Sequence, residues 1–280
     1  MSSQDSFSRR SFLTGASAAL ALPAFAKKKV PVGLEMFSVR NELAKDLTGT
    51  VKAVAKAGYQ GVEFFAPYMQ WTAAQTKDVR KLLDDLGMKC YSTHNGPNSF
   101  TTQVDKAIEL NGILGSNFIV CASAGKVVGL DGWKKVADML NGGAEKMKAA
   151  KIRAGYHNHQ AEFRELEGKL PIEVIASNTE KSIMLQLDVG TCIEAGQDPV
   201  AWINKNPKRI NCVHCKDWSS DKSKGYRVLF GDGDAKWKEI FKAAEKKGGI
   251  EYYLIEQEGY SLPPFETIEK CLENYKKIHG

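Results

Sequence analysis

After position 26, the sequence has no apolar run that approaches the ~18 residues of a membrane-spanning helix. It has no stretch rich in proline, glycine and serine of the kind that links two domains. It also lacks a strong excess of one charge, because 39 Lys and Arg are interleaved with 33 Asp and Glu, for a net charge of +6. These absences argue against a stable membrane anchor, against a second domain, and against a basic stripe that binds nucleic acid.

The composition that remains is that of an ordinary globular protein. The chain has 280 residues, of which 43% are hydrophobic and 26% are charged. Disordered, collagen-like and coiled-coil chains have different compositions. A length of this order suits one large domain, and α/β barrels often run to about 250 residues as a single unit.

The first 26 residues differ from the rest and read MSSQDSFSRRSFLTGASAALALPAFA. Arg9 and Arg10 precede an uncharged run of small and apolar residues, which ends in the A-x-A sequence of Ala24–Ala26. This resembles a twin-arginine export signal of the S-R-R-x-F-L type. We therefore assign residues 1–26 to a signal peptide and residues 27–280 to the mature domain. The resemblance implies a periplasmic protein that is exported by the twin-arginine machinery, and no cysteine near the cleavage site indicates a lipid anchor.

Export by this route predicts a simple mutational result. Replacing both Arg9 and Arg10 by Lys should leave the precursor in the cytoplasm, because the arginine pair is the signal that the machinery reads. Cell fractionation and immunoblotting would measure this. Efficient arrival of the variant in the periplasm would contradict the assigned route.

The six cysteines do not form a metal-binding or disulfide pattern. Four of them lie in apolar, strand-like runs, where buried free cysteine is common. Cys212 and Cys215 have C-x-x-C spacing, but no second pair exists. In a strand, residues three apart point to opposite faces, which disfavours a shared metal.

Eight short β-rich runs alternate with helical patterns along the mature chain. Most of these runs are almost continuously apolar, as expected of parallel strands that are buried on both faces. Eightfold alternation over about 250 residues predicts a single (β/α)8 TIM barrel. An open doubly wound sheet is the alternative, but the first run lacks the glycine-rich phosphate turn of that fold. The eight runs cover residues 30–37, 61–65, 89–94, 117–123, 153–159, 183–190, 210–217 and 251–258.

The helical patterns between these runs have recognisable ends. Thr72 is a suitable N-cap for a helix over Thr72–Leu86, and Gly87 follows it directly. Similar apolar stripes predict helices over residues 131–150, 234–247 and 265–278. A glycine that can end a helix in the left-handed conformation precedes several of the strands, namely Gly58, Gly87, Gly115 and Gly248.

Polar residues collect where the predicted strands end. Four of the five histidines do so, namely His94, His157, His159 and His214. In a TIM barrel the catalytic residues lie at the carboxyl ends of the strands. The sequence therefore predicts an active site at that end of the barrel.

Acidic residues occupy the same positions. Asp188 ends the apolar run LQLDVG and Glu256 ends YYLIE, while Glu35 and Glu63 lie within other runs. Burying a carboxylate costs several kcal/mol unless it is paired or bound to a metal. For Glu35 and Glu63 alone, ordinary pairing is the simpler interpretation. For Asp188, His214 and Glu256 together, the combination of ligand types favours a divalent metal.

The motifs GLEMFSVR, GYQGVEFF, YHNHQAEF, LQLDVGT, INCVHCKD, FGDGDAKW and YYLIEQE resemble those of the xylose isomerase-like TIM-barrel family, within the sugar phosphate isomerase/epimerase superfamily. The resemblance covers about residues 29–278. It implies one divalent cation, with manganese, magnesium, cobalt and zinc as candidates, held by Asp188, His214 and Glu256. Many relatives supply a Glu at the end of the fifth strand, where this chain reads HNHQAE. We assign Glu162 as the fourth ligand, with His159 as the alternative.

The same resemblance implies roles for other residues. Glu256 is expected to act as ligand and base, and His157 is an independent candidate for moving the proton. Lys216 would steady an oxyanion, unless it forms only a salt bridge with Asp188 or Asp217. The residues expected to contact the substrate are His94, Glu63, His159 and Phe65.

Three functions follow as alternatives. The first is a metal-dependent isomerase or epimerase that removes a proton next to the carbonyl of a sugar or glycoside outside the cytoplasm. The second is a lyase that uses the same site for β-elimination from a 3-keto-glycoside or sugar acid. The third is a non-catalytic sugar-binding barrel. A small-molecule sugar is the expected partner, nucleic acid is not, and the sequence is compatible with a homo-oligomer.

Overall fold

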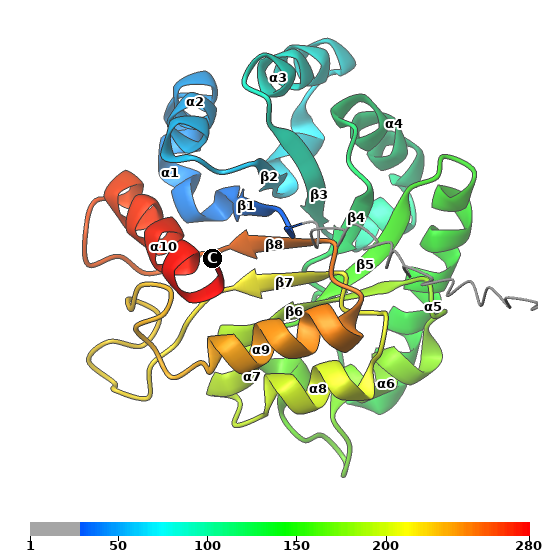
Figure 1. Cartoon of the computed structure of the whole chain (residues 1–280). Helices are drawn as coiled ribbons and strands as arrows, with labels where there is room; N and C mark the ends of the chain where they lie inside the picture. Colours follow the sequence, from blue (N-terminus) through cyan, green and yellow to red (C-terminus); the bar gives the residue numbers. More distant parts are fainter. Residues whose placement is uncertain (1–28) are drawn as a thin grey trace, which may run out of the picture.

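The computed structural model describes residues 29–280, so the predicted signal peptide lies outside the described residues. Eight parallel strands form a closed barrel in chain order, and helices surround it (Figure 1). The single (β/α)8 barrel predicted from the sequence is confirmed. The strands are β1 (Val32–Glu35), β2 (Gly61–Phe64), β3 (Lys89–Asn95), β4 (Phe118–Cys121), β5 (Arg153–His157), β6 (Met184–Asp188), β7 (Cys212–Cys215) and β8 (Tyr252–Ile255).

Pairing of the first and last strands closes the barrel and excludes an open sheet. Leu34 of β1 pairs with Val62 of β2 on one side and with Ile255 of β8 on the other. Every neighbouring pair around the barrel is parallel, and the β2–β3 pair contains a register shift next to Glu63. The carboxyl ends of all eight strands therefore meet at one mouth.

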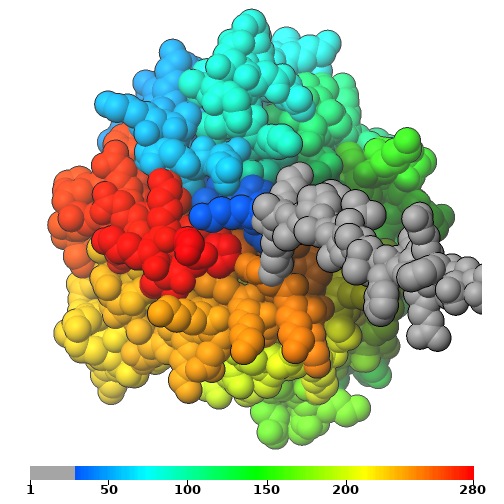
Figure 2. All heavy atoms as spheres, viewed as in Figure 1, coloured from blue at the N-terminus to red at the C-terminus, as the bar shows by residue number. Residues whose placement is uncertain are grey.

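The helices follow one another around the barrel in chain order, as the successive colours around the rim show (Figure 2). Short 3-10 turns follow several strands. The α-helices are α1 (Arg40–Lys45), α2 (Leu47–Ala57), α3 (Ala73–Asp85), α4 (Val104–Leu114), α5 (Gly129–Lys148), α6 (Pro171–Asn178), α7 (Val189–Glu194), α8 (Pro199–Lys205), α9 (Trp237–Ala243) and α10 (Pro264–His279).

Most of the helix ends predicted from the sequence are confirmed. Thr72 caps α3 in a reciprocal capping box with Gln75, and Gly87 follows this helix with φ of 66°. Two details differ. The helix before β8 starts at Trp237 rather than at 234, and Gly249, not Gly248, adopts the left-handed conformation, with φ of 82°. The reason for the second difference is that a π-helical turn over Ala244–Gly248 extends α9 through Gly248.

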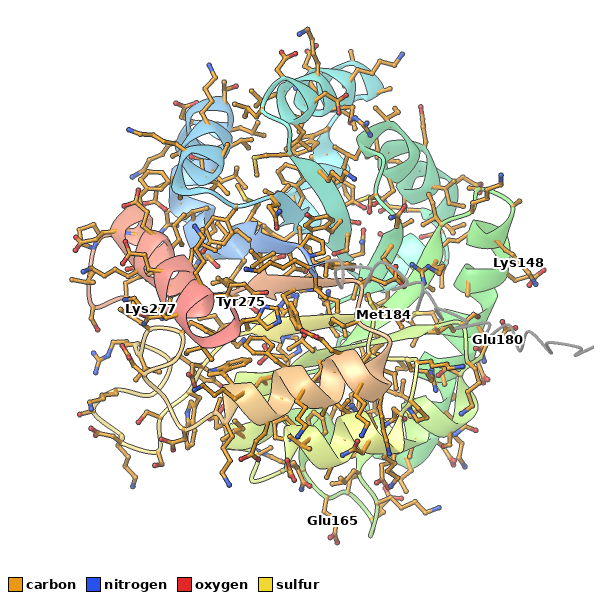
Figure 3. The ribbon with its side chains drawn as sticks, in the orientation of Figure 1. Lys148, Glu165, Glu180, Met184, Tyr275 and Lys277 are labelled. Carbon is orange, nitrogen blue, oxygen red and sulfur yellow. The ribbon has the colours of Figure 1, made fainter. Side chains whose placement is uncertain are left out.

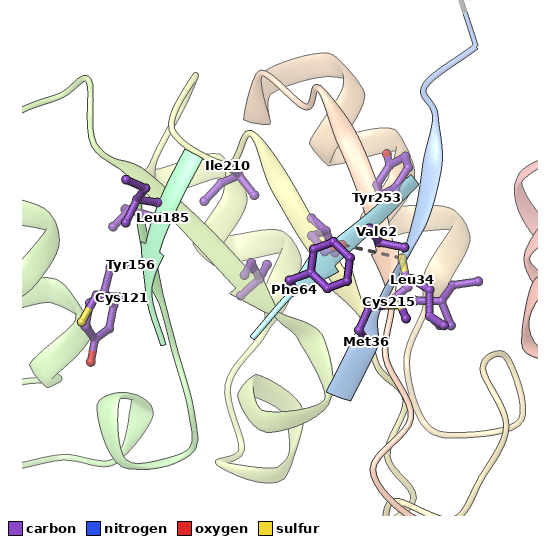
Figure 4. Packing of buried hydrophobic residues seen from close by; sticks show 14 of the residues in the cluster. Leu34, Met36, Val62, Phe64, Cys121, Tyr156, Leu185, Ile210, Cys215 and Tyr253 are labelled. Carbon is purple, nitrogen blue, oxygen red and sulfur yellow. Dashed lines mark hydrogen bonds between the residues drawn. The ribbon is translucent and has the colours of Figure 1, made fainter. Parts of the chain in front are cut away.

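Alternation along the strands separates two apolar regions. Outward-facing residues such as Leu34, Val62 and Tyr253 pack beneath the helices (Figure 4). A smaller cluster fills the barrel interior below the mouth, and its members are Tyr91, Phe118, Val120, Met184, Cys212, Tyr252 and Leu254. The inward positions above this cluster are left to polar residues.

All six cysteines are buried and free, whereas the sequence suggested this for the four in strand-like runs. Cys212 and Cys215 belong to different clusters. Charged side chains such as Lys148, Glu165 and Glu180 extend from the rim, while Met184 points inward (Figure 3). Within residues 29–280, no helix is long and apolar enough to cross a membrane.

Candidate metal centre and active site

A cavity of about 290 Å³ opens at the carboxyl ends of the strands. This volume lies at the lower end of the ~300–1,000 Å³ typical of small-molecule sites. One part of its wall is apolar and includes Phe37 and Phe65. The other part carries ionisable groups, namely Glu35, His94, His157, His159, Glu256 and Glu258. The cavity therefore combines an apolar wall with groups that move protons or bind cations.

Four residues at the inner end of this cavity can hold a metal together. One donor atom from each of His157, Asp188, His214 and Glu256 lies within 4.8 Å of the other three. Strands β5 to β8 bring them to this point. His157 and Asp188 end their strands, His214 is the next-to-last residue of β7, and Glu256 directly follows β8. Two imidazoles and two carboxylates form a donor set that suits a divalent transition metal. Three of these four residues, Asp188, His214 and Glu256, were assigned as ligands from the sequence.

Asp188 supplies the donor atom that fits a cation best. The residue is fully buried, and its Oδ1 accepts a hydrogen bond from the backbone N–H of Thr191 at the start of α7. Its Oδ2 lies 2.6 Å from Lys216 Nζ but has no aligned hydrogen bond to any described residue. The Lys216 ammonium group therefore already balances part of the Asp188 charge, and the remaining lone pair of Oδ2 is the one that a metal would use.

His214 lies between two carboxylates in the barrel interior. Its Nδ1 is 2.8 Å from Glu256 Oε2, and its Nε2 is 2.7 Å from Glu63 Oε2. Burial lowers the pKa of His214, but the two carboxylates outweigh burial and raise it to about 10. The site thus attracts positive charge. Both ring nitrogens carry hydrogen in the metal-free protein. Nδ1, which faces Glu256, is the nitrogen that would give up its hydrogen to bind a metal, while Nε2–H stays donated to Glu63.

His157 is the second imidazole of the group, and it is 2% exposed. Its Nδ1 is 2.9 Å from Gln186 Oε1, and its Nε2 is 3.7 Å from Asp188 Oδ2. Burial and the positive charges of neighbouring histidines hold its pKa well below the usual value. The ring is therefore neutral at pH 7, which is the form that binds metals.

The geometry differs from the sequence-based assignment at Glu162. Its Oε1 accepts a hydrogen bond from Tyr156 Oη at 2.6 Å, and its Oε2 accepts one from the backbone N–H of His159 at 3.0 Å. Tyr156 is in the outward-facing core, so the carboxylate of Glu162 is held away from the other ligands. His157 completes the group of four in its place.

This arrangement predicts opposite results for two substitutions. Glu162→Gln should keep one metal per chain and lose about 1–2 kcal/mol of stability, because one of two buried hydrogen bonds is weakened. His157→Ala should lose the metal, because it removes a donor atom. Metal analysis after dialysis and thermal unfolding would measure both. Loss of metal in Glu162→Gln with retention in His157→Ala would restore the original assignment.

The residues expected to contact the substrate separate into two sets. His94, His159 and Phe65 line the cavity. Glu63 is fully buried and instead contacts His214 and His94, with His94 Nε2 at 3.1 Å from its Oε2. Burial raises the pKa of Glu63, but the two histidines outweigh it and lower the value to about 2. Glu63 therefore lies behind the metal-binding group as an ionised hydrogen-bond acceptor.

Lys216 is 1% exposed, and its ammonium group lies close to three carboxylates. Its Nζ is 2.6 Å from Asp188 Oδ2, 3.1 Å from Glu258 Oε1 and 3.7 Å from Glu256 Oε2. Burial lowers its pKa, but these three acids outweigh burial and raise the pKa well above normal. Lys216 is therefore a cation beside the cavity. The predicted pair with Asp188 is present. Asp217 instead accepts hydrogen bonds from the loop before α9 and from Trp237 Nε1, at 2.7 Å, in the first residue of α9.

Sequence reasoning missed two residues of this site and gave a third no role. Glu258 follows β8, lines the cavity and pairs with Lys216. Gln186 lies in β6 and contacts three site residues. Glu35 lines the cavity with an Oε2 that bonds to no described residue, and burial and Glu63 raise its pKa well above normal. The sequence did contain a signal for two of these residues. Side chains two apart along a strand point to the same face, and Gln186 precedes Asp188 by two while Glu258 follows Glu256 by two.

Comparison with known proteins agrees with the geometry. Residues 51–278 match the family model described as Xylose isomerase-like TIM barrel. The crystal structure of a sugar phosphate isomerase/epimerase from Parabacteroides distasonis superposes with a TM-score of 0.76 and 28% identity. That match covers 92% of this chain and 96% of the other.

Two further relatives were found by sequence. Inosose dehydratase of Clostridium beijerinckii is 28% identical over 166 residues, which are 53% of this chain and 55% of that protein. The match therefore spans only about half the length of that dehydratase. The rhizopine catabolism protein MocC of Rhizobium meliloti is 25% identical over 239 residues, which are 72% of each protein.

Proposed function

Because this chain belongs to the xylose isomerase-like TIM-barrel family, we propose that it is a metal-dependent enzyme that removes a proton next to the carbonyl group of a sugar or a related polyhydroxy ketone. The observation that carries the proposal is the group formed by His157, Asp188, His214 and Glu256 at the inner end of the cavity. Manganese, cobalt, zinc and magnesium are the candidate cations. A divalent metal held there supplies Lewis-acid polarisation of the substrate oxygens.

The protein's own residues provide the proton and charge steps. Glu256 contacts His214 and Lys216 through Oε2, and its side chain lines the cavity. Its Oε1 is therefore the oxygen that takes the proton from the carbon next to the carbonyl. The Lys216 ammonium group donates a hydrogen bond to the oxygen on which negative charge develops. Phe37 and Phe65 cover the apolar face of the substrate.

Isomerisation or epimerisation is the first form of this reaction. When Glu256 returns its proton to the neighbouring carbon and a second proton moves between the two oxygens, an isomer forms. An epimer forms when Glu256 keeps its proton and a second acid that lines the cavity protonates the same carbon from the opposite face. The similarity to the sugar phosphate isomerase/epimerase over 92% of this chain supports this form.

Dehydration is the second form, and the similarity to inosose dehydratase favours it. After the same proton removal, a hydroxyl group on the β-carbon leaves with a proton as water, and a carbon–carbon double bond forms. Glu258 lines the cavity and lies 3.1 Å from Lys216, and burial raises its pKa, so it is the candidate proton donor for that hydroxyl. The reaction balances without any oxidant.

The site of action is part of the proposal. Arg9 and Arg10 support export to the periplasm. A protein in that compartment meets free sugars, glycosides and oligosaccharides. We therefore expect an unphosphorylated substrate, and the Arg-to-Lys replacement described above tests the premise.

One experiment tests the function and separates its two forms. The purified protein is stripped with a chelator, reloaded with one cation at a time, and incubated in D₂O with a panel of free ketoses, inososes and 3-keto-glycosides. Deuterium uptake next to the carbonyl is expected only in reloaded protein, because the carbonyl must be polarised before the proton leaves. Mass and NMR spectra then distinguish an isomer from a dehydrated product. Binding of a sugar with neither exchange nor product would instead indicate a sugar-binding barrel.

A further inference from the structure

Gln186 is a buried amide with no role in the proposed function so far. It is 1% exposed and points into the barrel from β6, two residues before Asp188. Its Oε1 lies 2.7 Å from His94 Nε2 and 2.9 Å from His157 Nδ1. Its Nε2 lies 3.0 Å from Glu63 Oε1. One side chain therefore joins two imidazoles and a carboxylate.

The orientation of this amide follows from its partners. An ionised carboxylate only accepts hydrogen bonds, so the amide NH₂ group must face Glu63. The reverse orientation would place the amide oxygen against the carboxylate oxygens and is excluded on charge. The amide oxygen consequently faces both rings. Because this oxygen only accepts, His157 Nδ1 and His94 Nε2 must each carry a hydrogen.

Glu63 connects Gln186 to His214. Glu63 receives the NH₂ group of Gln186 on Oε1 and accepts the Nε2–H of His214 on Oε2 at 2.7 Å. The hydrogen on His157 Nδ1 leaves Nε2 with its lone pair toward Asp188. His214 differs, because its Nδ1 also faces a carboxylate oxygen, Glu256 Oε2 at 2.8 Å, and donates a hydrogen to it in the metal-free protein.

We propose that Gln186 is a positioning residue of the metal centre, whose amide selects the ring nitrogen that His157 presents to the cation. The inference rests on the metal site of the proposed function and adds a residue to it. Outer groups that orient histidine ligands typically change metal affinity by ~10–100-fold when they are removed.

Two substitutions of Gln186 separate positioning from packing. Gln186→Met keeps the length of the side chain but removes the acceptor for both rings, and we expect it to weaken metal binding by ~10–100-fold. Gln186→Glu is the conservative variant, because a protonated Glu beside Glu63 donates through O–H and accepts through C=O as the amide does. It should bind metal within about threefold of the unmodified protein, which is small against the ~10–100-fold effect of a lost orienting group.

Asn111→Leu is the matched control. Asn111 is also a fully buried amide, and it bonds to Tyr68 Oη at 2.8 Å and to the carbonyl of Ala107 outside the metal centre. Its replacement should lower the melting temperature and leave metal affinity unchanged. The probe is Zn²⁺, measured by competition with a chromophoric chelator in the purified full-length protein.

A spectroscopic measurement tests the inference without any variant. With five histidines in the chain, ¹⁵N-histidine NMR of the Zn²⁺-loaded protein resolves each ring. His157 should carry hydrogen on Nδ1 and His214 on Nε2, and Gln186→Met should mix the tautomers of His157. The opposite tautomers in the unmodified protein, or an unchanged Zn²⁺ affinity in Gln186→Met, would overturn the inference. If the protein binds no divalent metal, the proposed function fails, and the tautomer of His157 in metal-free protein still decides the role of Gln186.

Discussion

Asp188→Asn is expected to remove stoichiometric metal and nearly all turnover. The substitution keeps an oxygen that accepts the hydrogen bond from Thr191 N–H at the start of α7, but it removes the negative charge that faces the cation. Since loss of an orienting group alone costs ~10–100-fold in metal affinity, loss of a charged ligand should cost more than ~100-fold. Elemental analysis after dialysis, together with deuterium exchange, would measure both effects.

The choice of Asn rather than Ala matters for this test. Alanine would also remove the N-cap of α7, worth ~0.5–2 kcal/mol. Both replacements leave the buried Lys216 without its nearest carboxylate, at a cost of up to ~3–5 kcal/mol, so circular dichroism must show that the Asn variant is folded. An unfolded Ala variant would lose metal for reasons unrelated to coordination.

Asp198→Asn is the matched control for Asp188→Asn. Asp198 caps α8 by accepting a hydrogen bond from Val200 N–H at 2.8 Å, and it lies outside the group of four. Both variants should fold, and only Asp188→Asn should lose metal. One metal per chain in Asp188→Asn would show that the cation lies elsewhere or does not depend on this carboxylate.

Sequence reasoning could predict the barrel because each of its steps is local. The strands are apolar runs bounded by helices. The start of a helix such as α3 is predicted by its N-cap Thr72, and its end by Gly87. The loop before α9 was harder to predict. Hydrogen bonds from Gly231 N–H, Ala235 N–H and Trp237 Nε1 to Asp217 hold it in place, and no nearby sequence pattern reveals these bonds.

The metal centre could be predicted only in part for a similar reason. Asp188, His214 and Glu256 lie at or within one residue of the ends of apolar strands, so chain position alone brings them together. At the fifth strand the candidates from the sequence were Glu162 and His159, and the choice depends on where each side chain points. In the structure the Tyr156 hydroxyl group donates to Glu162, while His157 lies with Asp188, His214 and Glu256. A bond of this kind depends on side-chain direction, which composition and spacing do not contain.

Lys216→Met is expected to separate charge stabilisation from metal binding. Methionine has nearly the length of lysine but neither its charge nor its hydrogen-bond donors. If Lys216 donates to the oxygen on which negative charge develops, its loss should lower the rate of deuterium exchange by ~10²–10³, as loss of one such donor does in other enzymes. The metal should be retained, because Asp188 and Glu256 lose a competing cation that lies 2.6 Å and 3.7 Å from their carboxylate oxygens.

Lys205→Met serves as the control, because Lys205 pairs with Glu173 at the outer surface and neither residue lines the cavity. It should change neither exchange nor metal content. For Lys216→Met, metal content and exchange rate must be measured on the same preparation, so that a lost ligand group is not mistaken for a lost donor. An exchange rate within about threefold of the unmodified protein, against the ~10²–10³ expected of a lost donor, would show that Lys216 only balances the charge of the three surrounding acids.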